Sequence, residues 1–325
     1  MSLYEEFGDA CSILVPVDIV NTAGALVSMT ANGVAVPEDT NPAWAAATTY
    51  TAGERVHLPS THRVYESTGA SGNAGKDPSL PANQYNAAGQ PTFWIDIGPT
   101  NRTAMFDGLV STQTIAASPL VITLAPGAFN GFSLFGVDAD SFSVQVLDAP
   151  GGNVIYSEPT TPLEGSMPGD YYEYFFDPFK PLRQFNRFGV DPYGRSQIQI
   201  TFNRATGNVG VGMFAIGDLK PVGVPLKGVK VEPMDFSSIV QDRFGNATVR
   251  RRANSTGMTI STVMEEDEAN SVLQTIKDTL GVPCVVVGSN AMLYEWMTVF
   301  GTISGSMSDQ PYPYVTLQLT VRGFI

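Results

Sequence analysis

Charged residues are scarce in this sequence, and most of those present are acidic. Asp, Glu, Lys and Arg make up 15% of the 325 residues, well below the usual quarter. The formal net charge is −13, whereas affinity for nucleic acid comes mostly from clustered Lys and Arg. Arg250-Arg251-Arg252 is the one short basic cluster, which we interpret as an exposed strand, with contact to an acidic neighbouring subunit as the alternative. We therefore expect no specific nucleic-acid partner.

Histidine and cysteine are rarer still, which argues against catalysis and metal binding. The only histidines are His57 and His62, in one short segment with few candidate partners. The only cysteines, Cys11 and Cys284, belong to no CxxC pair, so we expect two buried thiols rather than a metal or redox site. Motifs of serine hydrolases, zinc peptidases and nucleotide-binding loops are absent. We expect no enzyme activity, no catalytic residues, no bound metal and no cofactor.

Long apolar runs and a secretory leader are also missing. No segment has the uninterrupted apolar length needed to span a bilayer, and the N-terminus begins with acidic rather than basic residues. We therefore expect a protein made in the cytoplasm, without a signal peptide or a membrane span. A role outside the cell would then need another route out, and assembly into a virion that is released by lysis would be one.

What the sequence does contain is the patterning of several β units. Hydrophobic residues make up 43% of the chain, enough for sizeable cores. Strict alternation in Phe142/Val144/Val146 and in Ile198/Ile200/Phe202 predicts strands with one buried face, as in a β-sandwich or jelly roll. We predict a mainly β protein of four units: an N-terminal β arm (1–40), a small aromatic-rich β module (41–98), a central β-sandwich (99–222) and a C-terminal β-sandwich with one α-helix (223–325).

The N-terminal arm contains a strong turn signal. Asn32-Gly33 separates two short β-like segments and predicts a tight hairpin. A two-stranded arm is only marginally stable by itself. We therefore expect residues 11–37 to pack on another domain or on another subunit.

The C-terminal unit contains one segment with helical periodicity. Acidic residues at 265–268 suit a helix N-terminus, and apolar residues then recur every three or four positions. Gly281 and Pro283 suit the helix end. We predict one helix near residues 266–280, with a buried face formed by Val272, Leu273 and Ile276.

The module at 41–98 is rich in aromatic residues. Short strands are predicted around 54–57, 62–65 and 93–98, with a Gly-, Asn- and Pro-rich loop at 68–91. Flat rings with polar edges suit sugar faces, but a unit this small also needs aromatic residues for its own core. The core interpretation is favoured, for Tyr65 and Trp94 in particular.

The same module carries a recognisable pattern. The segment WAAATTYTAGERV (44–56), followed by HRVYES (62–67) and closing on Trp94, resembles the small chitin-binding type of carbohydrate-binding module. Glu54 stands where that pattern usually has Asp. The resemblance implies a small β fold and host-surface glycan as a partner, with these candidate sugar-binding residues: Trp44, Tyr50, Tyr65, Tyr85 and Trp94.

Two further segments resemble phage proteins. The junction WIDIGPTNRTAMFD (94–107) is similar to one that follows this module in tail proteins of tailed phages. The C-terminal unit places an Arg-rich strand (247–252), a second strand (257–262), the helix and then strands ending at 317–321 in that order. This order resembles the ring-forming domain of distal-tail and tail-tube-related proteins. Together they imply a structural component of a phage tail tip or baseplate, located in the virion. Its implied partners are further copies of itself, in a ring of six or three, and other tail proteins such as tube, hub and fibres.

Two alternative functions remain open from the sequence. One is a receptor-binding lectin that recognises host-surface polysaccharide through its β modules. The other is a hydrolase of cell-wall or capsule glycans, which is disfavoured because no acid/base pair of carboxylates is evident.

Overall fold

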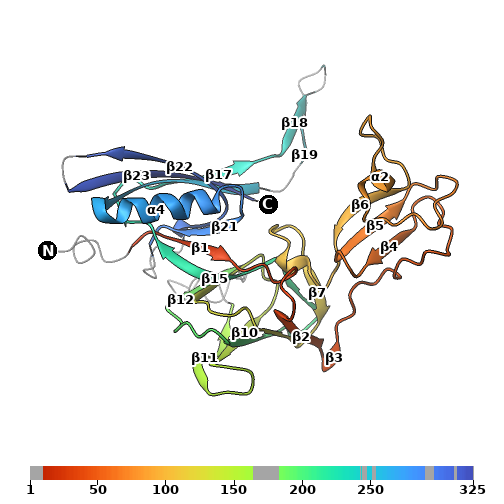
Figure 1. The fold of residues 1–325 in the computed structure, drawn as a ribbon, viewed down its shortest axis with the longest axis horizontal. Coiled ribbons are helices and arrows are strands. Elements are labelled where there is room, and N and C mark those ends of the chain that lie inside the picture. The colour runs from red at the N-terminus through yellow and green to blue at the C-terminus, as the bar shows by residue number, and fades with distance from the viewer. Residues whose placement is uncertain are drawn as a thin grey trace.

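The computed structural model describes residues 10–163, 183–241, 243, 247–250, 254–289, 296–310 and 313–324. Within these residues the chain is mainly β, with one long helix near its C-terminal end, as the sequence predicts. Figure 1 shows two large sheets, the long helix lying along one of them, and a small three-stranded unit set to one side. None of the helices in this described part is long and apolar enough to cross a membrane.

The larger sheet has ten strands and runs through most of the molecule. Its strand order is β12-β9-β15-β1-β21-β22-β23-β20-β16, and β17 pairs with β20 off this path. In that order the strands are β12 (Gln184–Phe188), β9 (Gly131–Phe135), β15 (Met213–Pro221), β1 (Ser12–Pro16), β21 (Cys284–Val287), β22 (Thr298–Asp309), β23 (Tyr314–Gly323), β20 (Asn254–Glu265), β16 (Val224–Pro225) and β17 (Lys230–Asp235).

Strand β1 lies in the middle of this sheet and joins its two halves. Leu14 is opposite Leu219 of β15 on one side and Val285 of β21 on the other. The stretch at 11–37 thus packs within its own chain, the first of the two expected outcomes. The sheet continues from the central region into the C-terminal region, across the unit boundary that we predicted after residue 222.

The smaller sheet has six strands in the order β11-β10-β13-β8-β2-β3. Strands β2 and β3 form the predicted hairpin, in which Asn32 and Gly33 both have positive φ angles, of 48° and 77°. Such angles match the right-handed twist of the flanking strands. In sheet order the strands are β11 (Val154–Pro162), β10 (Ser141–Leu147), β13 (Gln197–Asn203), β8 (Leu120–Leu124), β2 (Leu26–Ala31) and β3 (Val34–Ala35).

The inner faces of the two sheets share one hydrophobic core. The predicted alternation is confirmed, because the alternating apolar residues are buried while the residues between them are more exposed: Phe142, Val144 and Val146 of β10, and Ile198, Ile200 and Phe202 of β13. Phe142 of β10 meets Phe185 of β12 edge to face, with 4.3 Å between ring centroids. Two further strands, β7 (Thr114–Ala117) and β14 (Asn208–Val211), pair with each other beside the sandwich.

Helix α4 (Glu266–Thr279) occupies the span that the sequence predicts. Its first turn carries three acidic residues, which favour the positive end of the helix dipole. Gly281 follows the helix with a φ of +77°, a conformation that glycine adopts without the steric cost of a Cβ. The predicted start and stop signals are therefore confirmed.

The buried face of α4 differs in one position from the prediction. Val272 and Ile276 are buried against the large sheet. Leu273 was expected to join them, and this expectation is wrong, because its side chain is 37% exposed. Successive helical residues are about 100° apart, so a packed face that follows Val272, Ile276 and Thr279 leaves Leu273 outside it.

The two cysteines are buried and unpaired. Cys11 precedes β1, and Cys284 begins the neighbouring strand β21. Burial raises the pKa of both thiols to about 12. The prediction of two buried thiols is confirmed.

The small module is a three-stranded sheet of β4 (Arg55–Leu58), β5 (Arg63–Ser67) and β6 (Trp94–Pro99). Its strands lie where the sequence predicts them, and the loop between β5 and β6 contains a single helical turn, α2 (Pro81–Gln84). The module has its own hydrophobic core, formed by Tyr50, Val56, Leu58, Tyr65 and Trp94.

Candidate functional site

Three of the five candidate sugar-binding residues lie inside the module. Trp94 and Tyr65 are almost completely buried, and Tyr50 is buried beside them. The rings of Tyr50 and Trp94 meet edge to face, with centroids 5.2 Å apart. The indole Nε1 of Trp94 donates a hydrogen bond to the carbonyl oxygen of Lys76 at 2.8 Å, which anchors the long loop. In this arrangement the three rings hold the module together and present no face to a ligand.

The other two candidates are more accessible. Tyr85 follows α2 and is 46% exposed. Trp44 is half-buried and packs against the module core. Among the described residues its Nε1 has no hydrogen-bond partner, although its backbone N–H donates to the His57 carbonyl at 2.9 Å. The surface that these five residues offer to a sugar is thus reduced to Tyr85 and the exposed part of Trp44.

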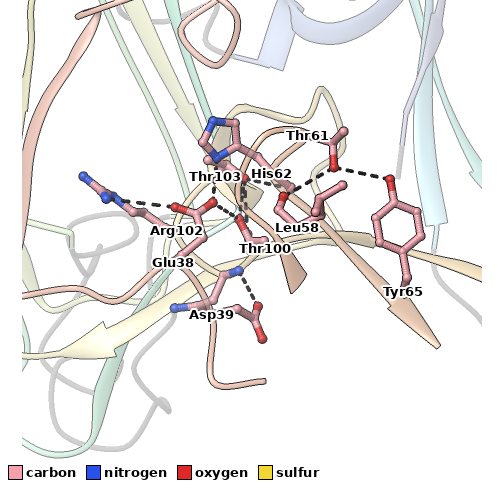
Figure 2. A network of polar contacts seen from close by, with 10 residues as sticks. Glu38, Asp39, Leu58, Thr61, His62, Tyr65, Thr100, Arg102 and Thr103 are labelled. Carbon is pink, nitrogen blue, oxygen red and sulfur yellow. Dashed lines mark hydrogen bonds and ion pairs between the residues drawn. The ribbon is translucent and has the colours of Figure 1, made fainter. Parts of the chain in front are cut away.

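A polar network connects the module to the rest of the chain, and Glu38 is at its centre (Figure 2). His62 Nδ1, in the turn between β4 and β5, lies 2.6 Å from Glu38 Oε1. Thr100 Oγ1, just after β6, donates to the same oxygen at 2.8 Å. Arg102 approaches the other carboxylate oxygen to 4.0 Å, and its backbone N–H donates to the Glu38 carbonyl at 3.1 Å. One carboxylate therefore holds both the β4–β5 turn of the module and the segment that follows β6.

The neighbouring residue, Asp39, forms a second connection. Its Oδ2 accepts a hydrogen bond from the Asn101 N–H at 2.9 Å, and its Oδ1 accepts one from the Asn41 N–H at 2.9 Å. Burial by itself raises the pKa of Asp39, but these hydrogen bonds outweigh it and hold the pKa below its usual value. The charged form of Asp39 is thus part of the folded junction.

The turn that presents His62 has an unusual backbone. His62 has a φ of +54°, which few residues other than glycine adopt. Its carbonyl accepts the Thr100 N–H at 2.9 Å, so the strained turn is held from two sides. The sequence pattern singled out the segment GPTNR at 98–102 only by resemblance. It gave no signal for its partners Glu38 and Asp39, which lie 62 residues away.

Two cavities lie against this junction, with volumes of about 380 Å³ and 240 Å³. His62, Thr103 and Phe106 line both of them. The larger cavity also contains Asp107, whose pKa is raised by burial. Both oxygens of Asp107 already accept hydrogen bonds, from the Leu109 N–H at 2.8 Å and from Thr112 Oγ1 at 2.6 Å. These two hydrogen bonds fix the carboxylate of Asp107 to the loop that follows it.

A further candidate feature is a hairpin of β18 (Ser238–Gln241) and β19 (Ala247–Arg250), which pairs with no other strand among the described residues. Its strands pair with each other and stand apart from both large sheets, projecting from the body (Figure 1). Val240 and Val249 are 54% and 57% exposed. Arg250 is exposed, as the sequence predicts, whereas Arg251 and Arg252 lie outside the described residues. The hairpin is a candidate surface for contact with another molecule.

Comparison of the chain with protein-family models, with curated proteins and with solved structures found no match.

Proposed function

We propose that the chain is a structural subunit of a phage tail tip or baseplate, which assembles with copies of itself into a ring. The observation that carries this proposal is the projecting β18–β19 hairpin. A two-stranded ribbon exposed on both faces is marginally stable alone, and its apolar residues and free edges favour contact with another chain.

The junction supports a second part of the proposal, that the module is displayed in a constant orientation. Glu38 and Asp39 hold the module through the hydrogen bonds described above, which fix its orientation relative to the rest of the chain. A fixed orientation suits a module that must present one face outward from a particle. In this proposal the ring belongs to the virion, and the module meets other tail proteins or a host-surface glycan.

Imaging of intact phage particles, combined with native mass spectrometry of the purified full chain, tests the proposal. We expect six or three copies per tail and a native mass that corresponds to one ring. One copy per tail, or absence of the protein from virions, would contradict it.

A receptor-binding lectin is the second candidate, and exposed Tyr85 on the module favours it. A glycan array with the full chain and with the variant Tyr85→Ala distinguishes the two proposals. If the full chain binds a glycan and the Tyr85→Ala variant does not, the lectin proposal is supported. If neither protein binds any glycan on the array, the result counts against it.

A further inference from the structure

Helix α4 has a second apolar stripe that faces solvent. Leu273 of α4 and Leu280, the C-cap residue directly after the helix, are seven residues apart, which places them on the same side. Their side chains are 37% and 54% exposed, in contrast to Val272 and Ile276 on the packed face. The outer side of α4 and its C-cap thus offer two leucines that the described part of the chain leaves exposed.

The β18–β19 hairpin has matching apolar residues. In its register Val249 is opposite Ile239, and Val240 is opposite Thr248. Because neighbouring residues of a strand point to opposite faces, Val240 and Val249 lie on opposite faces of the ribbon. Both are exposed, so each face carries an uncovered valine.

The charges of the two surfaces are opposite. The hairpin carries Arg243 and Arg250, both exposed, in a chain whose acidic residues outnumber its basic ones by 31 to 18. The exposed charged residues of α4 are Glu266, Asp267 and Asp278 with one lysine, Lys277, beside the two leucines, so this surface is net acidic. Opposite potentials of this kind favour encounter and set the register of a contact.

We infer that the β18–β19 hairpin of one copy docks on the outer stripe of α4 of the next copy. In Figure 1 the hairpin points away from the body while α4 lies along the large sheet, so the hairpin does not cover the α4 of its own chain. A contact between two different surfaces is heterologous, and its repetition produces a closed ring or an open filament rather than a two-fold dimer. This inference rests on the proposed ring and identifies the surfaces that would build it.

Disulfide trapping between two single variants of the full chain, Val249→Cys and Leu273→Cys, tests the contact. The native thiols of Cys11 and Cys284 should not compete with the introduced cysteines, because they are buried and their pKa is raised to about 12. Under mild oxidation the mixture is expected to give several-fold more linked dimer than either variant alone. Ile115→Cys is a matched control, because Ile115 is 50% exposed but lies on β7 of the central unit.

The outcomes separate this inference from the proposed function. If the mixture gives no more dimer than the Ile115→Cys control while the native mass still shows a ring, the docking site is wrong and the ring stands. If Val249→Cys alone links as well as the mixture, the contact is symmetric and the inference is overturned. If only monomer is found at every concentration and no dimer can be trapped, both fail.

Charge reversal provides an independent measurement on the same chain. Arg250→Glu is expected to weaken assembly about two- to fivefold, since exposed ion pairs contribute little each. Arg195→Glu changes the net charge equally at an exposed loop position and should leave assembly unchanged. Equal weakening by both variants would indicate a net-charge effect and overturn the proposed contact.

Discussion

Arg187 and Glu158 tie the free edges of the two large sheets together. Arg187 on β12 donates from Nε to Glu158 Oε2 at 2.8 Å and from Nη2 to Oε1 at 2.6 Å, while Glu158 belongs to β11 of the other sheet. Tyr156 donates its hydroxyl to the same carboxylate at 2.7 Å, and the Arg187 guanidinium lies 4.2 Å from the ring centre of Phe185. This pair closes the sandwich at the side where β11 and β12 are the last described strands of their sheets.

Removal of this pair is expected to destabilise the fold measurably. Glu158→Ala leaves a partly buried guanidinium without its partner, a change that costs about 3–5 kcal/mol for a fully buried pair. Arg187 is 36% exposed, so water compensates in part, and we expect a loss of about 2 kcal/mol. Urea unfolding at pH 7 measures it. Glu232→Gln, in the exposed Lys230–Glu232 pair, is the control and should leave the free energy of unfolding unchanged.

The stability that Asp39 contributes should disappear in acid. Its folded pKa is lowered, so its contribution is fully present above the unfolded value of about 3.9 and is lost as the pH falls through the folded value. We expect the difference in free energy of unfolding between wild type and Asp39→Asn to be constant near neutrality and to shrink below about pH 4. Urea titrations at several pH values measure this difference. A difference independent of pH down to pH 2 would contradict the role of the charged form.

The core of the small module should depend on Trp94 and not on Tyr85. Trp94→Ala removes a fully buried indole and is expected to cost about 3–5 kcal/mol. Tyr85→Ala removes a half-exposed ring and should have little effect on stability. Thermal unfolding of both full-length variants, followed by near-ultraviolet circular dichroism, tests this. Trp94→Ala with wild-type stability but without sugar binding would instead make Trp94 a ligand residue.

Ile276 and Leu273, which lie on different sides of α4, should respond differently to truncation. Ile276→Ala opens a cavity under the helix and is expected to cost about 2–4 kcal/mol. Leu273→Ala removes a side chain that is partly solvated already, and we expect less than about 1 kcal/mol for the monomer. Urea unfolding at low protein concentration, where assembly does not contribute, makes the comparison. Similar losses at both positions would place Leu273 in the core after all.

Local patterns in the sequence predicted much of the secondary structure. The Asn32-Gly33 hairpin depends on two residues that tolerate positive φ, and alternation in β10 depends on which face meets the core. The span of α4 follows from acidic residues at its start and Gly281 after its end. All of these signals lie within a few residues of the structure they specify, so no knowledge of distant contacts is needed.

Tertiary structure alone decided the features that concern function. The sequence did not indicate that β1 lies between β15 and β21, that Leu273 stays outside the core, or that Glu38 meets His62 and Thr100. For Tyr50 and Trp94 the sequence favoured a core role and left sugar binding as the alternative, since the chemistry that suits a ring to one suits it to the other. Each of these choices depends on pairings between distant segments, whose energies are settled only when the whole chain packs.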